Sequence, residues 1–111
     1  MTQGQQRLTL SEECDIIEVD EALAGTLGYT YQGLIGCQFE SILTKAASVL
    51  FHLSMLPRLR IDGKVERMHL ALRTTEGRVL QARVQAARLH AAEQRGLAAR
   101  SAYHLALDLS E

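Results

Sequence analysis

Residues 28–39 read GYTYQGLIGCQF, and this stretch organises the first half of the chain. Gly28 follows a short run with apolar residues at helical spacing, so it is placed to end a helix in a left-handed turn. Thr30 is a suitable N-cap for a second short helix over Tyr31–Ile35, which Gly36 closes. The stretch therefore predicts two short helices joined by tight glycine turns.

The residues before Gly28 predict a hairpin and the first of these helices. Two strand-like runs, Arg7–Leu10 and Asp15–Val19, flank the turn-like Ser11-Glu12-Glu13. Asp20 then precedes the helical run 21–27, and aspartate is a good N-cap. We expect the Asp20 side chain to cap that helix.

The longest predicted helix follows, over Thr44–Leu56, after a single turn at Phe39–Leu43. Its apolar residues recur at helical spacing and should face the core. These residues are Val49, Leu50, Leu53 and Leu56, and the stripe is widened by Ala46, Phe51 and Met55. Pro57 disfavours the helical conformation of the residue before it, so we expect a kink or an end there.

The second half changes to an alternating pattern that predicts three long antiparallel strands. They cover about 65–73, 78–89 and 103–109, with a hairpin turn at 74–77 and a longer loop at 92–99. Each has one apolar face. Five strands with the helices grouped on one face indicate an α+β fold, a five-stranded antiparallel sheet covered by short helices and one longer helix.

Length, charge and cysteine content narrow the class of protein. The 111 residues fit one domain, which we place at 7–111 after a flexible stretch over 1–6. A net charge of −1 gives no attraction to nucleic acid. Cys14 and Cys37 form neither a disulfide framework nor a zinc pattern, so a reduced, cytoplasmic protein is expected. No apolar run is long enough for membrane insertion.

Several short motifs, in this order, resemble those of PAS domains. They are DIIEVD at 15–20, LGYT at 27–30, LIG at 34–36, Phe39, and EGR at 76–78. The resemblance covers about residues 8–109 and departs at Asp20, where asparagine is usual. It implies a sensory or interaction module, not an enzyme, inside a larger bacterial signalling protein. The implied output domains are a histidine kinase, a diguanylate cyclase or a phosphatase. Because the chain ends on a strand, where a signalling helix often follows, we suspect a truncated chain.

The resemblance to PAS domains also indicates which cofactors this chain could bind. In the flavin-binding LOV subfamily the reactive cysteine lies three residues after the glycine, whereas Cys37 lies one residue after Gly36. Flavin is therefore not expected. We expect Cys37 to be a small structural residue without a reactive role. Heme is a weaker alternative, with His52 on the long helix as its axial ligand. A hydrolase or isomerase built on His52 lacks a second catalytic group to orient it.

A small apolar ligand between the long helix and the sheet is the remaining possibility. Met55, Met68, Leu70, Ala82 and Tyr103 are its predicted contacts, and His52 joins them if heme is bound. The wider set of inward residues also includes Leu50, Leu53, Leu72, Val84, Ala86 and Leu105. Small alanines leave volume that either methionine and leucine or a ligand must fill. A filled core without any cofactor is the favoured alternative.

The opposite face of the sheet is predicted to be polar. Arg67, His69, Arg73, Arg83, Gln85 and His104 should share it with Ala71, Ala87, Ala102 and Ala106. This face is either solvated or forms a homodimer contact, as PAS domains often do. Nucleic acid is not expected, because these cations lack aromatic stacking partners.

Overall fold

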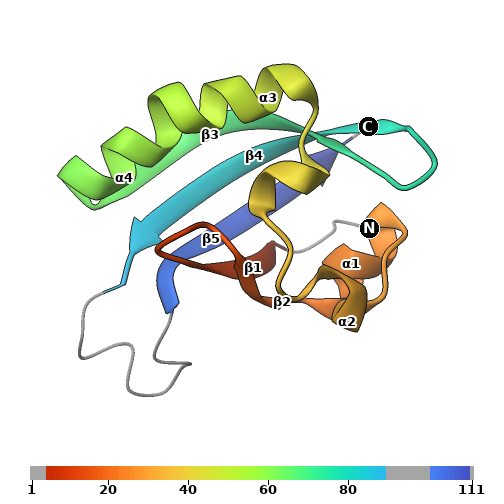
Figure 1. Cartoon of the computed structure of the whole chain (residues 1–111). Helices are drawn as coiled ribbons and strands as arrows, with labels where there is room; N and C mark the ends of the chain where they lie inside the picture. Colours follow the sequence, from red (N-terminus) through yellow and green to blue (C-terminus); the bar gives the residue numbers. More distant parts are fainter. Residues whose placement is uncertain (1–4, 90–100, 111) are drawn as a thin grey trace.

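A computed structural model describes residues 5–89 and 101–110 (Figure 1). The strands are β1 (Gln6–Ser11), β2 (Ile16–Val19), β3 (Lys64–Arg73), β4 (Val79–Arg88) and β5 (Ser101–Ser110). The helical segments are α1 (Glu21–Leu27), α2 (Tyr31–Leu34), the 3₁₀ turn η1 (Phe39–Ile42), α3 (Lys45–Leu50), the π turn η2 (Phe51–Met55) and α4 (Leu56–Asp62). The predicted loop at 92–99 lies outside the described residues.

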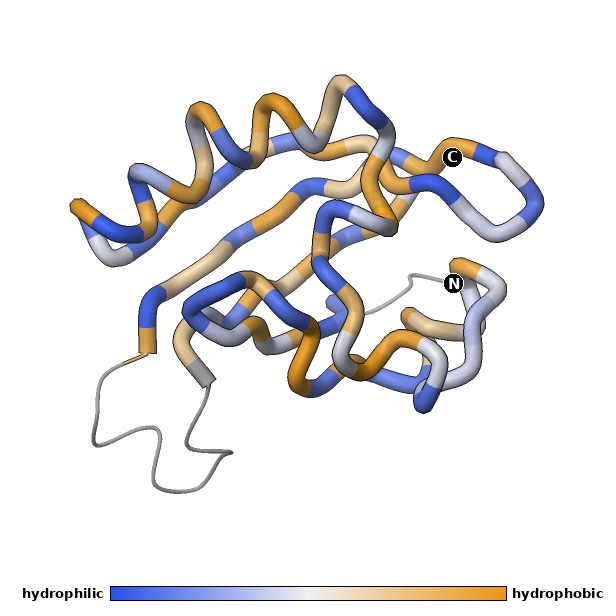
Figure 2. The backbone as a smooth tube through the Cα atoms, in the orientation of Figure 1, coloured by the Kyte–Doolittle hydropathy of each residue, from blue (hydrophilic) through white to orange (hydrophobic). Residues whose placement is uncertain are grey.

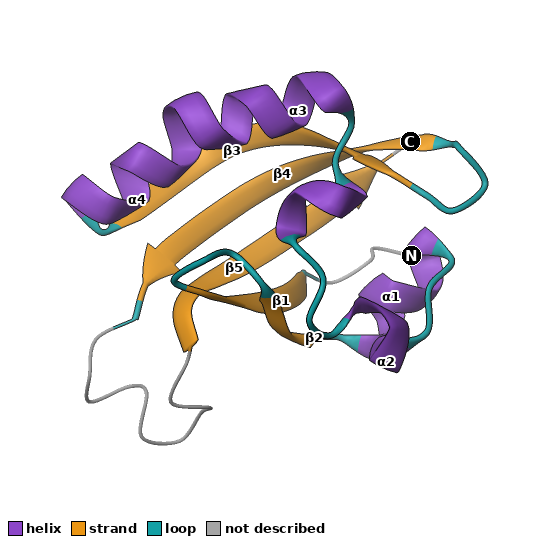
Figure 3. Cartoon of the chain, in the orientation of Figure 1, coloured by secondary structure: helices purple, strands orange, loops and turns teal. Residues whose placement is uncertain are grey.

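The strands form one antiparallel sheet in the order β2-β1-β5-β4-β3. The segments α3, η2 and α4 join into a single long helix that runs along β3 and β4 (Figure 3). The predicted α+β architecture is confirmed. No helix within the described residues is both long and apolar enough to cross a bilayer.

Alternating strand residues build the core, as predicted (Figure 2). Along β4 the residues Leu80, Ala82, Val84 and Ala86 are buried, and the residues between them are exposed. In β3 the register slips between Val65 and Met68, and Arg67 has a φ of 62°. This bulge adds a residue, so Val65 and Met68 both turn toward the core although three positions separate them.

The long helix buries only part of the apolar stripe that was predicted to face the core. Phe51 and Met55 are buried, whereas Leu50 is 41% exposed and Leu53 is 77% exposed. Val49 is 53% exposed as well, so the predicted inward positions of Val49, Leu50 and Leu53 are wrong. Met55 and Leu56 are buried as predicted. The buried residues Ala47, Phe51, Met55 and Leu59 recur every four positions, so Leu50 and Leu53 point away from the core.

Pro57 does not end this helix. It stands near the start of α4, directly after the π turn, and the helix continues to Asp62. A proline lacks the N–H that a regular helix would use, and the helical register already changes in η2. The helix therefore gains a buried residue beyond the proline, Leu59.

Asp20 lies at the N-cap position of α1, but the prediction that its side chain caps the helix is wrong. The Asp20 side chain makes no capping bond to the helix; its carboxylate accepts a hydrogen bond from the backbone N–H of Arg7 at 2.9 Å. Thr30 caps α2 as predicted, since its hydroxyl accepts a hydrogen bond from the Gly33 N–H at 3.0 Å. Asp20 thus fastens the start of α1 to β1.

Gly28 ends α1 with a φ of 90°, as predicted. A Cβ at this position would lie 2.1 Å from the Thr75 hydroxyl oxygen in the β3–β4 turn. The Thr75 N–H also donates to the Leu27 carbonyl at 2.9 Å. Glycine is needed here both for its backbone conformation and for the close approach of the β3–β4 turn.

Candidate functional site

The helix–sheet interior contains most of the predicted ligand contacts. Met55 comes from the π turn, Leu70 and Ala82 are paired neighbours in β3 and β4, and Tyr103 comes from β5. All four are at most 1% exposed and belong to one hydrophobic cluster. Met68 is half-buried and packs against that cluster. These five residues share the space between helix and sheet.

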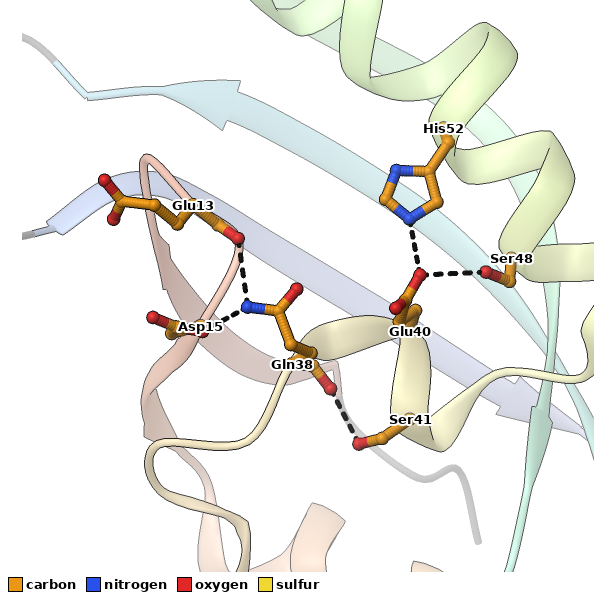
Figure 4. A network of polar contacts seen from close by, with 7 residues as sticks. All are labelled: Glu13, Asp15, Gln38, Glu40, Ser41, Ser48 and His52. Atoms are coloured by element: carbon orange, nitrogen blue, oxygen red, sulfur yellow. Dashed lines mark hydrogen bonds and ion pairs between the residues drawn. The ribbon is translucent and has the colours of Figure 1, made fainter.

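His52 lies outside that space. It is exposed, and its Nε2 is 2.7 Å from Oε1 of Glu40, which also accepts a hydrogen bond from the Ser48 hydroxyl (Figure 4). The bond to His52 holds the pKa of Glu40 below its usual value. The His52 ring is exposed, although it packs edge-on against Phe51 with ring centroids 5.2 Å apart. A heme bound between helix and sheet does not fit this placement, because the Nε2 atom is engaged by Glu40.

A polar network closes one end of the interior, and sequence analysis missed it. The Tyr103 ring is buried, and its hydroxyl donates to Glu12 at 3.0 Å and accepts from Nε of Arg60 at 3.2 Å. Arg60 also donates to the Glu12 carbonyl at 3.3 Å. Burial and the bond to Glu12 raise the pKa of Tyr103, whereas Arg60 opposes the rise. The network ties the β1–β2 turn to α4 and β5.

This network was not predictable because its members lie far apart in the chain. Arg60 and Tyr103 are 43 positions apart, and Glu12 and Tyr103 are 91 positions apart. A tyrosine within an apolar strand pattern was the available signal, since a buried phenol needs a hydrogen-bond partner.

Neither cysteine is placed as a reactive thiol. Cys14 is buried, and burial raises its pKa to about 11 despite the nearby Arg60. Such a thiol stays protonated near neutral pH and is a poor nucleophile. Cys37 donates through its sulfur to the Gly33 carbonyl at 3.3 Å. Both positions fit the scaffold role predicted for Cys37.

A second polar network also holds the β1–β2 turn (Figure 4). The Gln38 amide donates to the Glu13 carbonyl at 3.2 Å and to a carboxylate oxygen of Asp15. The Ser41 hydroxyl donates to the Gln38 carbonyl at 2.7 Å. Residues 12–15 are thus connected to both η1 and α4.

The outer sheet face carries most of the predicted polar residues in exposed positions. Arg83 is flanked by His69 on β3 and by Asp108 on β5, which forms a cross-strand row of cation and anion. Ala87 is exposed and Ala106 is half-buried. Ala102 alternates with the buried Tyr103 and is only 6% exposed, so it offers little surface to a partner.

His104 is the centre of this outer face. Its Nε2 is 3.5 Å from a guanidinium nitrogen of Arg7, and its Nδ1 is 3.5 Å from the Thr9 hydroxyl. Burial, with Arg7 as a further cause, lowers the pKa of His104. Two grooves of about 330 and 320 Å³ meet at Arg7 and His104. The outer face is therefore hollowed on both sides of this pair.

No family profile and no curated protein matches this chain. Solved structures do. A PAS domain from Colwellia psychrerythraea has a TM-score of 0.74 at 11% identity, covering 94% of this chain and 85% of its own. A PAS domain from a two-component sensor histidine kinase has a TM-score of 0.71 at 14% identity, covering 96% and 84%.

A third similar structure is the PAS domain of a LuxR-family transcriptional regulator from Burkholderia thailandensis, solved in complex with ethanol. Its TM-score is 0.72 at 17% identity, and the alignment covers 94% of this chain and 88% of that one. The chain has the PAS fold.

Proposed function

We propose that this chain is a regulatory input module of a larger bacterial signal-transduction protein. Catalysis lies in an output domain of the parent chain, such as a histidine kinase, diguanylate cyclase or phosphatase. The PAS fold carries this proposal, together with similar structures from a sensor histidine kinase and a transcriptional regulator. The two free thiols suit a reducing compartment, so the proposed location is the cytoplasm.

The module works as a homodimer through its outer sheet face. The exposed Ala87 and the half-buried Ala106 permit close approach of a second sheet. The row of His69, Arg83 and Asp108 offers both signs of charge, which a two-fold symmetric contact can pair with itself. A signal then acts by shifting the population of dimer arrangements, and so the state of the output domain.

The test places a large charged side chain in the middle of this face. Ala106→Arg should convert a dimer of twice the 12.3 kDa chain mass into a monomer, as measured by sedimentation equilibrium. Ala22→Arg, at an exposed position of α1, is the matched control and should remain dimeric. A wild-type chain that is monomeric, or an Ala106→Arg variant that still dimerises, contradicts the proposal.

A second candidate is a sensor of a small, weakly polar molecule. Met55, Leu70, Ala82 and Tyr103 are buried in the same hydrophobic cluster, and a similar PAS domain was solved with ethanol. Native mass spectrometry tests this directly. Added mass that disappears on denaturation, and that is absent from Met68→Trp, supports a ligand in the interior. A bare chain mass favours the ligand-free dimerisation module.

A further inference from the structure

The outward side of the long helix concentrates the exposed apolar side chains of this protein. Six large apolar residues are exposed among the described residues, and four of them lie on this one helix. They are Val49 at 53%, Leu50 at 41%, Leu53 at 77% and Ile61 at 82% exposed. Single exposed apolar residues need no explanation, but a concentration on one element marks a contact surface.

The helix is held rigidly behind these residues. Its opposite side buries Phe51, Met55 and Leu59, each at 0% exposure. The Phe51 ring packs edge-on against Phe39, with ring centroids 5.0 Å apart. The exposed residues therefore project from a fixed backbone and cannot retract into the core. A rigid helix with projecting apolar anchors suits packing against another amphipathic helix.

The charges along this helix are mostly positive. Residues 45–62 contain three lysines or arginines and a single acidic residue, Asp62. Arg60 is engaged by Tyr103 and Glu12, whereas Lys45 and Arg58 are exposed near the two ends of the helix. A second copy would bring like charges together, which disfavours self-association here. A partner with acidic residues beside its apolar ones is complementary.

We propose that the outward side of residues 45–62 binds an acidic amphipathic helix of a partner protein. Leu53 and its apolar neighbours Val49 and Leu50 are the anchors, and Lys45 and Arg58 pair with flanking carboxylates. An anionic lipid surface fits less well. Two free cations contribute only weakly to lipid binding, and the whole chain carries a net charge of −1. This surface is separate from the outer sheet face, so the inference does not depend on the proposed dimer.

The experiment uses two labelled synthetic peptides of the same helical design. Both have leucines at every third or fourth position; one carries glutamates beside them and the other lysines. Fluorescence anisotropy with the whole chain should show saturable binding of the glutamate peptide only. Leu53→Ser should weaken this binding about tenfold, because one largely exposed leucine loses its burial in the complex. Arg58→Glu should weaken it as well.

Val79→Ser is the matched control, since Val79 is another exposed apolar residue, on β4, at 49% exposure. It should bind the glutamate peptide like the wild type, and all variants should retain the wild-type circular dichroism spectrum. Failure of the glutamate peptide to bind, or equal binding of the lysine peptide, overturns the proposal.

Two further outcomes would overturn the proposal in favour of another occupant. Loss of self-association in Leu53→Ser assigns the surface to a second copy. Sedimentation with vesicles containing anionic lipid, lost in Leu53→Ser, assigns it to a membrane surface. Dimerisation that responds to Ala106→Arg but not to Leu53→Ser keeps the outer-face dimer and this partner site distinct.

Discussion

Gly28→Ala should destabilise this fold for two separable reasons. The backbone at Gly28 has a φ of 90°, and forcing a residue with a Cβ into this region costs about 1 kcal/mol. The new Cβ would also lie 2.1 Å from the Thr75 hydroxyl oxygen, so the Thr75 side chain must move. An off-rotamer or rotated threonine, with its weak 3.5 Å contact to the Gly28 carbonyl lost, adds about 1–2 kcal/mol.

Gly63 provides the matched control for the backbone contribution. Its φ is 84°, but a Cβ there would meet no atom within 4 Å. Gly63→Ala should therefore cost only the conformational part, about 1 kcal/mol. Urea denaturation of the two variants measures both free energies of unfolding, and Gly28→Ala should be the less stable by about 1–2 kcal/mol.

A double-mutant cycle isolates the contact with Thr75. Thr75→Ala removes the hydroxyl that lies 2.1 Å from the new Cβ and leaves only the Thr75 Cβ, at 3.3 Å. In this background Gly28→Ala should cost about as much as Gly63→Ala, which corresponds to a coupling of about 1–2 kcal/mol between the two positions. Equal costs for the two glycines in the wild-type background, or no rescue by Thr75→Ala, would refute the packing of the β3–β4 turn on α1.

Three further predictions concern the helix, the polar network and the outer face. Leu53→Glu should change the free energy of unfolding by no more than about 0.5 kcal/mol, whereas Phe51→Ala should cost about 3–5 kcal/mol, both by urea denaturation. Tyr103→Phe should cost about 1–2 kcal/mol and speed hydrogen exchange of residues 12–15, because the bond between the phenol and the Glu12 carboxylate is lost. Unchanged exchange would count against the network. The folded-state pKa of His104 lies below 6.5, so its contribution to stability is complete above that pH and declines as the pH falls through it. His104→Gln should therefore make stability less sensitive to pH between about 7.5 and 5.5, as measured by urea denaturation at several pH values.

The strand pattern was the most predictable part of this fold. Alternation placed Leu80, Ala82, Val84 and Ala86 inside correctly, because a strand has a period of two that survives any packing of the sheet. The glycine and threonine signals at Gly28 and Thr30 were also local, since each acts within one turn of its own backbone. Strand alternation, the helix end at Gly28 and the cap at Thr30 could be predicted because each depends on residues close together in the sequence.

The buried side of the long helix could not be predicted from the local sequence. Its apolar residues occupy both sides, so the sequence pattern allowed more than one inward face. Packing of Phe51 on Phe39, with the π turn between α3 and α4, selected one face and left Leu53 outside. The folded chain also brings His52 against Glu40, a contact between residues 12 positions apart that the helical pattern did not indicate.

The amino-acid sequence alone thus determined the order of elements, the α+β class and the alternation that builds the sheet, because these depend on neighbours along the chain. Tertiary structure alone decided which side of the long helix is buried, where Asp20 and His52 find partners, and that Glu12, Arg60 and Tyr103 meet. Those outcomes depend on contacts between residues far apart in the chain. They arise only when the sheet and the long helix close on one core.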